Sequence, residues 1–171
     1  MFYTFFLCVA LLLGLASMKA QDVFEAARQG DVKRLSALYA LKPDTLSSVN
    51  AAGFPPLVIA GYHHQNEAVV YLLNHGASVN QDSPEGPVLL AAAYKGYADA
   101  VQLILTYRPD VNACNALGTT ALIYASMLGR ADIVSMLLRA GADKGKKEVS
   151  GRDAAFYANQ REYKEVLRLL E

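Results

Sequence analysis

Four segments of the sequence align with one another at intervals of 32 or 33 residues. They begin at Gly53, Glu85, Gly118 and Gly151. Each has an alanine seven residues further on and an acidic residue fourteen residues further on: Ala60, Ala92, Ala125 and Ala158, then Glu67, Asp99, Asp132 and Glu165. A period of this length is typical of repeat proteins, in which a single unit cannot bury its apolar face alone and stacks on its neighbours.

One unit of the repeat predicts two short helices and a loop. Leu57–Tyr62 is apolar and contains an alanine, which favours a small helix that packs closely against its neighbours. Glu67–Asn74 has apolar residues at helical spacing, and its leading acid complements the helix dipole. Gly76 suits a left-handed helix cap. The polar stretch Val79–Gly86 predicts an extended turn before the next unit.

The sequence resembles ankyrin repeats at both ends of the unit. Three stretches are similar to the family's T-P-L-H-x-A signature without its histidine: Pro55–Ala60, Pro87–Ala92 and Thr120–Ala125. Three others are similar to the G-A-D-V-N that usually ends the repeat: Gly76–Asn80, Pro109–Asn112 and Gly141–Asp143. The resemblance covers Asp22–Glu171. It implies an all-α fold, a solenoid of about five stacked helix pairs joined by extended hairpin loops.

The first twenty residues differ from the repeats in composition. Phe5–Leu15 is apolar except for Gly14, too short for a comfortable membrane span, and small residues follow it. This pattern predicts a secretory signal peptide over residues 1–20, cleaved after Ala20 or alternatively after Ala16. A retained anchor is the other interpretation, because no Lys or Arg precedes the apolar run.

The rest of the chain, residues 21–171, is expected to form one domain of five units. We divide it into an N-terminal capping pair, three internal repeats and a C-terminal capping repeat: residues 22–50, 51–80, 81–112, 113–145 and 146–171. By analogy with signal-bearing ankyrin proteins of bacteria, the expected location is the periplasm or outside the cell.

Charge and motifs exclude several kinds of chemistry. The chain has 16 basic and 16 acidic residues, and this balance argues against nucleic acid as a partner. Gly141–Lys147 lacks the spacing and the hydroxyl residue of a phosphate-binding loop. His63, His64 and His75 do not complete a metal ligand set, and Cys114 is expected to be a free thiol, with an intermolecular disulfide as the alternative. We therefore expect no cofactor, no metal and no catalysis, and no membrane contact once residues 1–20 are removed.

The loop tips and the ends of the first helices carry apolar and aromatic residues where a solvated surface would carry charge. Aromatic side chains are favoured anchors at protein interfaces. The predicted partner-binding residues are Phe54, Tyr62, His63, Tyr94, Lys95, Leu117, Met127 and Leu128. Tyr62 and Tyr94 are expected to be exposed, whereas Met127 and Leu128 could equally belong to the core.

Together with these observations, the resemblance to ankyrin repeats implies a monomeric, non-catalytic module that binds another protein through its loop tips and concave helix face. The alternative within this class is an immunity or inhibitor protein that blocks a toxin or an enzyme. The second class is a metal- or thiol-dependent enzyme that uses His63, His64 or Cys114.

Overall fold

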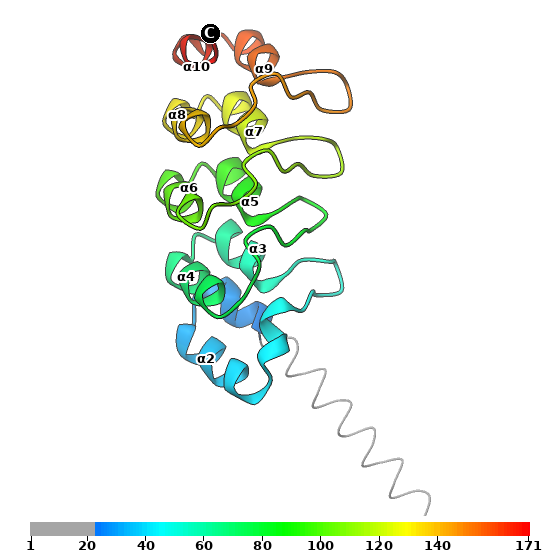
Figure 1. The fold of residues 1–171 in the computed structure, drawn as a ribbon, viewed down its shortest axis with the longest axis vertical. Helices are drawn as coiled ribbons and strands as arrows, with labels where there is room; N and C mark the ends of the chain where they lie inside the picture. Colours follow the sequence, from blue (N-terminus) through cyan, green and yellow to red (C-terminus); the bar gives the residue numbers. More distant parts are fainter. Residues whose placement is uncertain (1–22) are drawn as a thin grey trace, which may run out of the picture.

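The computed structural model describes residues 23–171, and the predicted signal peptide lies outside the described residues. Helix pairs stack along one axis, and hairpin loops project from one side of the stack (Figure 1). The pairs are residues 23–29 with α2 (Val32–Leu41), α3 (Pro56–Tyr62) with α4 (Asn66–Asn74), α5 (Val88–Lys95) with α6 (Ala98–Leu105), α7 (Ala121–Met127) with α8 (Ala131–Arg139), and α9 (Ala154–Gln160) with α10 (Lys164–Leu170). The predicted all-α solenoid of stacked helix pairs is confirmed.

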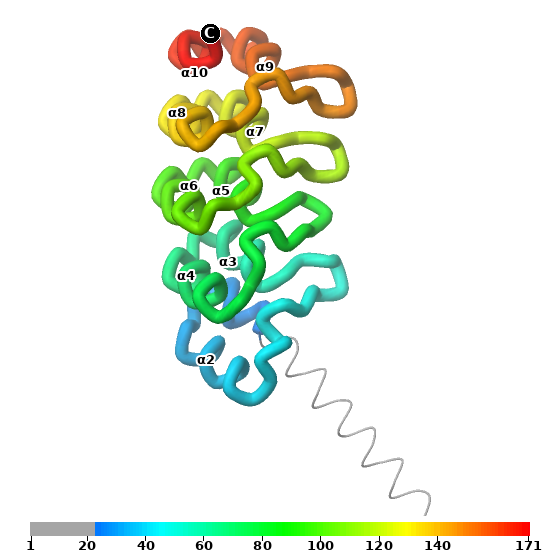
Figure 2. The backbone as a smooth tube through the Cα atoms, in the orientation of Figure 1, coloured from blue at the N-terminus to red at the C-terminus, as the bar shows by residue number. Residues whose placement is uncertain are grey.

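The first helices of successive pairs form one column of the stack, and the second helices form another (Figure 2). α3 packs on α5, α5 on α7 and α7 on α9, while α6 packs on α8 and α8 on α10. The recurring alanines lie in the first column and are fully buried: Ala60, Ala92, Ala125 and Ala158. A residue without a long side chain is needed there because neighbouring helices approach closely on both sides.

The hairpins between the pairs share one turn geometry. A glycine with positive φ stands in each turn, at Gly53, Gly86, Gly118 and Gly151, and its N–H donates to the carbonyl oxygen three residues earlier. Two residues separate this glycine from the next helix in the first, third and fourth hairpins, but only Pro87 separates Gly86 from Val88. The unit that we aligned from Glu85 therefore has its turn glycine one residue later than the alignment places it.

The N-terminal unit contains a 3₁₀ helix, Pro43–Ser47, that the sequence did not predict. Pro43 does end the preceding helix, as its position suggests, but it also starts this extra turn. Leu46 from this turn is 1% exposed and fills the core below α3. Gln81 Nε2 donates to the carbonyl oxygen of Ser47 at 2.9 Å, which ties the turn to the next hairpin.

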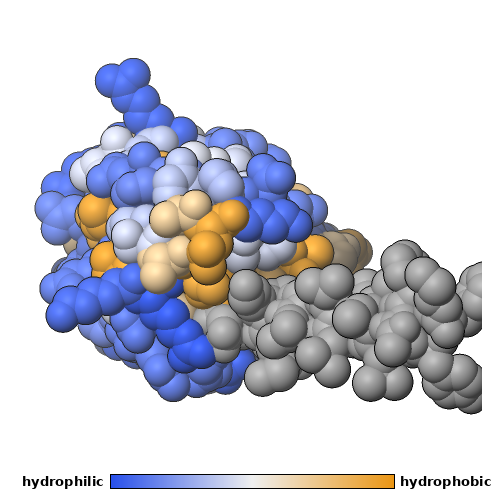
Figure 3. All heavy atoms as spheres, turned by 90° about the horizontal axis from the view of Figure 1, so that it is seen from below, coloured by the Kyte–Doolittle hydropathy of each residue, from blue (hydrophilic) through white to orange (hydrophobic). Residues whose placement is uncertain are grey.

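The N-terminal end of the stack has a largely hydrophilic surface with a few apolar side chains (Figure 3). A terminal solenoid unit needs such a polar outer face for solubility. In this unit the exposed large apolar side chains among the described residues are Leu41 and Val49. None of the helices described for the chain has the length and apolar character that crossing a membrane requires.

Ser126 is a buried serine whose replacement by alanine is expected to stabilise the protein. It is fully buried in α7, and its hydroxyl oxygen has no hydrogen-bond partner within the described residues. Ala93 occupies the same position of the preceding repeat and is also fully buried. A buried polar atom without a partner costs free energy, so Ser126→Ala should raise the free energy of unfolding by about 1 kcal/mol. Urea denaturation of both proteins measures this, and a clear loss of stability would contradict it.

Candidate functional site

A groove with a volume of about 410 Å³ lies between the hairpins and the first helices. Four of the predicted partner-binding residues line it: Phe54, Tyr62, His63 and Tyr94. Its apolar wall is formed by side chains of α3 and α5, namely Val58, Ile59, Leu90 and Ala91. The volume lies within the range of about 300–1,000 Å³ that is usual for ligand pockets.

Tyr62 and Tyr94 share one face because they occupy the same position in successive repeats. Tyr62 ends α3, and Tyr94 is the penultimate residue of α5. Both side chains are exposed, at 41% and 48%, as the sequence predicted. The ammonium nitrogen of Lys95 lies 4.7 Å from the centroid of the Tyr62 ring, so this predicted residue lies beside the groove and contacts one of its tyrosines.

Tyr124 is a groove residue that sequence reasoning missed. It comes from α7 and stands where Ile59 stands in α3 and Ala91 in α5, and all three line the groove. Its ring lies edge-on to Tyr94, with centroids 5.2 Å apart, and its hydroxyl accepts a hydrogen bond from Asn115 Nδ2 at 3.0 Å. The repeat period alone could have found it, because it places positions 59, 91 and 124 in line.

Three further side chains reach the groove from separate elements: Arg28, Asn50 and Glu85. Asn50 is occupied in its own hairpin, where its side-chain oxygen accepts the N–H groups of Ala52 and Phe54 at 3.0 and 2.9 Å. Arg28 lies 3.4 Å from the carboxylate of Glu25, one helical turn earlier. These residues were missed because no sequence spacing relates them to the tyrosines.

The surroundings of the groove shift the pKa of two of its residues. Burial lowers the pKa of His63 below its ordinary value of 6.5, and the positive charges of Arg28 and Lys95 lower it further, against a smaller opposite effect of Glu25. His63 is therefore neutral at pH 7. Burial and the negative charge of Glu85 raise the pKa of the Tyr124 hydroxyl, so this group keeps its proton.

The other predicted partner-binding residues do not line the groove. Leu117 is 59% exposed at a hairpin tip, and Leu128 is exposed after the end of α7. Met127 is only partly buried and packs against the core, which is the core alternative that the sequence left open. These three residues therefore belong to a different part of the surface, beside the third hairpin and α7.

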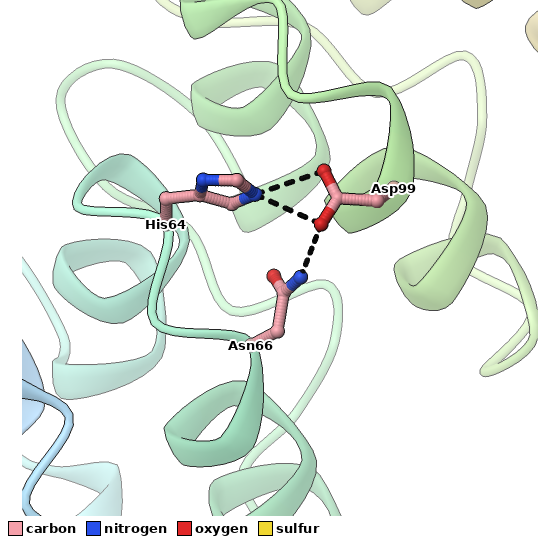
Figure 4. A network of polar contacts seen from close by, with 3 residues as sticks. All are labelled: His64, Asn66 and Asp99. Atoms are coloured by element: carbon pink, nitrogen blue, oxygen red, sulfur yellow. Dashed lines mark hydrogen bonds and ion pairs between the residues drawn. The ribbon is translucent and has the colours of Figure 1, made fainter.

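A polar network on the repeat boundary joins two residues that the sequence singled out separately. The Nε2 atom of His64 lies 2.8 and 2.9 Å from the two carboxylate oxygens of Asp99, and Asn66 Nδ2 donates to Asp99 Oδ2 at 2.6 Å (Figure 4). The His64 ring also stacks on Tyr97, with centroids 4.1 Å apart. These contacts connect the turn before α4 with the start of α6.

His64 occupies a position where glycine stands in the next two repeats. Its φ is +60°, close to the values of +72° and +68° at Gly96 and Gly129. A left-handed conformation costs a non-glycine residue about 1 kcal/mol or more. The contacts of the ring with Tyr97 and Asp99 offset that cost and explain why a histidine is tolerated here.

Asp99 makes this network depend on pH. Burial alone would raise its pKa, but hydrogen bonds from His64, from Asn66 and from the backbone N–H of Ala100 hold it below the ordinary value of 3.8. A lowered carboxyl pKa stabilises the fold above pH 3.8, and this contribution is lost as the pH falls through the folded-state pKa.

We therefore expect Asp99→Asn to be slightly less stable than the natural chain at neutral pH, by well under about 1 kcal/mol because the carboxylate is exposed. The difference should disappear as the pH falls below 3.8. Chemical denaturation of both proteins over a series of pH values measures it. A difference that stays constant into the acid range would show that the charge of Asp99 is not responsible.

The three histidine side chains and the cysteine have different surroundings, although His63 and His64 are neighbours in the chain. His63 lines the groove, His64 contacts Asp99, and His75 stacks on Tyr71 with ring centroids 4.0 Å apart. Cys114 is an exposed free thiol in the third hairpin. Within residues 23–171, no three His, Cys, Asp or Glu side chains converge in a way that could hold a metal ion.

A family model described as ankyrin repeats, in three copies, matches residues 88–171. The chain is 33% identical over 122 residues to the B-cell lymphoma 3 protein homolog of Mus musculus, an alignment that covers 70% of this chain and 27% of the mouse protein. It is 31% identical over 129 residues to the E3 ubiquitin-protein ligase XBAT33 of Arabidopsis thaliana, which covers 71% of this chain and 24% of the plant protein.

A bacterial relative is matched over more of its own length. The chain is 28% identical over 118 residues to the putative ankyrin repeat protein YahD of Escherichia coli K12, which covers 68% of this chain and 58% of that protein. The chain thus spans about a quarter of the mouse and plant relatives and just over half of the bacterial one. Most of the groove, including Tyr62 and His63, lies before the residues that the family model matches.

Proposed function

We propose that this chain, a solenoid of helix pairs that matches a family model of ankyrin repeats over residues 88–171, is a non-catalytic module that binds a partner protein in the groove between its hairpins and first helices. Ankyrin repeats generally mediate protein–protein interaction and are typically non-catalytic. The proposal extends this to a particular surface of this chain. We further propose that the protein acts in the periplasm or outside the cell, because residues 1–20 resemble a signal peptide. We also propose that it acts as a monomer.

The observation that carries the proposal is the cluster of aromatic side chains in the groove. Tyr62, Tyr94 and Tyr124 come from three successive repeats and line one continuous hollow with Phe54. A tyrosine offers a large apolar face and a polar tip at a low cost in conformational entropy. Such residues in a concave site are the usual anchors of a protein interface.

Site-directed photo-crosslinking tests where the partner binds. A benzophenone amino acid replaces Tyr94 in one bait and Gln102 in a matched bait, since Gln102 is exposed on the outer helix α6 of the same repeat. We expect covalent adducts with a partner protein from position 94 and none from position 102. Adducts from position 102 alone would place the partner on the outer helices and contradict the proposal.

A further inference from the structure

The charged groups in and around the groove differ in whether they have an ionic partner within the chain. Arg28 is paired with Glu25 at 3.4 Å, and the Lys95 ammonium lies over the Tyr62 ring. His63 is neutral at pH 7 because its pKa is lowered by burial and by those two cations. Arg28 therefore has an ionic partner within the chain, whereas Lys95, which does not line the groove, contacts an aromatic ring and keeps its full charge.

Glu85 is different, because its carboxylate is exposed and takes part in no ion pair within residues 23–171. It lines the groove together with Tyr94 and Tyr124. It lies close enough to Tyr124 for its charge to raise the pKa of that hydroxyl. Among the residues that line the groove, Glu85 thus carries the one charge that has no ionic partner within residues 23–171, and it stands beside aromatic rings.

The rings near Glu85 offer aromatic surface to a cation in the groove. Tyr94 and Tyr124 meet edge to face at an interplanar angle of 63°, so their faces point in different directions, and both rings line the groove. Aromatic faces attract ammonium and guanidinium groups, most strongly where water is excluded. The chain itself shows this contact twice, with Lys95 over Tyr62 and Arg152 over Phe156.

We propose that the groove receives a basic side chain of the partner protein, arginine in preference to lysine, held against Tyr94 and Tyr124 and beside the carboxylate of Glu85. Arginine is preferred because its planar guanidinium stacks on aromatic rings and forms paired hydrogen bonds with a carboxylate. The proposal rests on the proposed protein binding and names the chemistry that the groove recognises. A volume of about 410 Å³ accommodates one such side chain with its apolar neighbours.

A pair of short peptides tests the preference for a cation. Both carry the sequence Gly-Leu-Xaa-Leu-Gly with blocked ends, and Xaa is arginine in one and citrulline, its neutral isostere, in the other. Titration calorimetry with the full chain should show that the arginine peptide binds about fivefold more tightly, the size expected for a partly exposed cation site. Equal binding of the two peptides, or no binding of either, would overturn the proposal.

Two test variants, each with a control variant, assign the preference for arginine to particular residues. Glu85→Gln should reduce the affinity for the arginine peptide to that for the citrulline peptide, while Glu165→Gln removes an equally exposed carboxylate in α10 and should change neither. Tyr94→Phe keeps the aromatic face and should keep the preference, whereas Tyr94→Leu should lose it. A preference that survives both Glu85→Gln and Tyr94→Leu would place the cation elsewhere and overturn the proposal.

A third probe separates a docking site for protein from a site for small cations. Free arginine amide should bind more weakly than the peptide, because it lacks the leucines that contact the apolar wall; equal affinity would overturn the proposal.

The proposed protein binding fails if crosslinks come only from position 102. If the crosslinks come from position 94 and the peptides bind equally, the cation preference alone fails.

Discussion

Replacing Tyr62 and Tyr94 together with alanine is expected to weaken partner binding by about a thousandfold, because aromatic anchors at the centre of an interface commonly contribute about 2 kcal/mol or more each. The two side chains are 41% and 48% exposed, so their removal opens no cavity in the core. The thermal midpoint should therefore fall by no more than a few degrees, as is usual for surface substitutions. Binding is measured with the partner that the crosslinking identifies, and stability is measured by circular dichroism.

The matched control removes exposed apolar side chains from the other end of the stack. Phe156 and Leu169 are exposed in the C-terminal repeat at 44% and 36%, away from the groove. Their double alanine variant should bind the partner as the natural chain does. A large fall in the thermal midpoint of the Tyr62 and Tyr94 variant with its binding retained would show that these tyrosines serve the core.

Replacing Leu122 with alanine is expected to cost about 3 kcal/mol of the free energy of unfolding. Leu122 is 1% exposed in α7, which packs on α5 on one side and on α9 on the other. The substitution leaves a cavity between repeats that the packed helices can fill only in part. For a domain of this size the thermal midpoint should fall by about 6–12 °C.

Leu117 supplies the control for this effect, because it is the same residue type in the same repeat but is 59% exposed. Leu117→Ala should change the free energy of unfolding by less than about 0.5 kcal/mol. Urea denaturation of the two variants gives both values. Equal losses in the two variants would contradict the view that burial between first helices holds the stack together.

The repeat period was sufficient to predict the fold, because the same local signals for two helices recur in every unit. The alanines mark the first helices, and the recurring acids mark the starts of the second helices, so Pro56–Tyr62 and Asn66–Asn74 were predicted to within one residue at each end. The same period placed Tyr62 and Tyr94 on one face. The 3₁₀ helix was missed because Pro43 reads only as the end of a helix in the sequence.

The remaining groove residues come from different units of the stack, and no spacing in the sequence shows that they lie close together. Arg28 and Glu85 come from a helix and a hairpin of different units and meet only through stacking. In the sequence, His64 was noted as one of three histidines, and Asp99 as one of the acidic residues that recur at the same position of each repeat. Their contact forms because the His64 ring points toward the next unit, where it stacks on Tyr97 and contacts the Asp99 carboxylate.

The stacking of each helix pair on only its immediate neighbours has a consequence for how the molecule opens. Unfolding can start at α9 and α10, which cover the stack on one side only, and proceed one unit at a time. Backbone amides of the last unit should then exchange with solvent faster than those of α3 and α5. The groove is built from residues of the other four units, so the C-terminal unit can fray while the groove remains assembled.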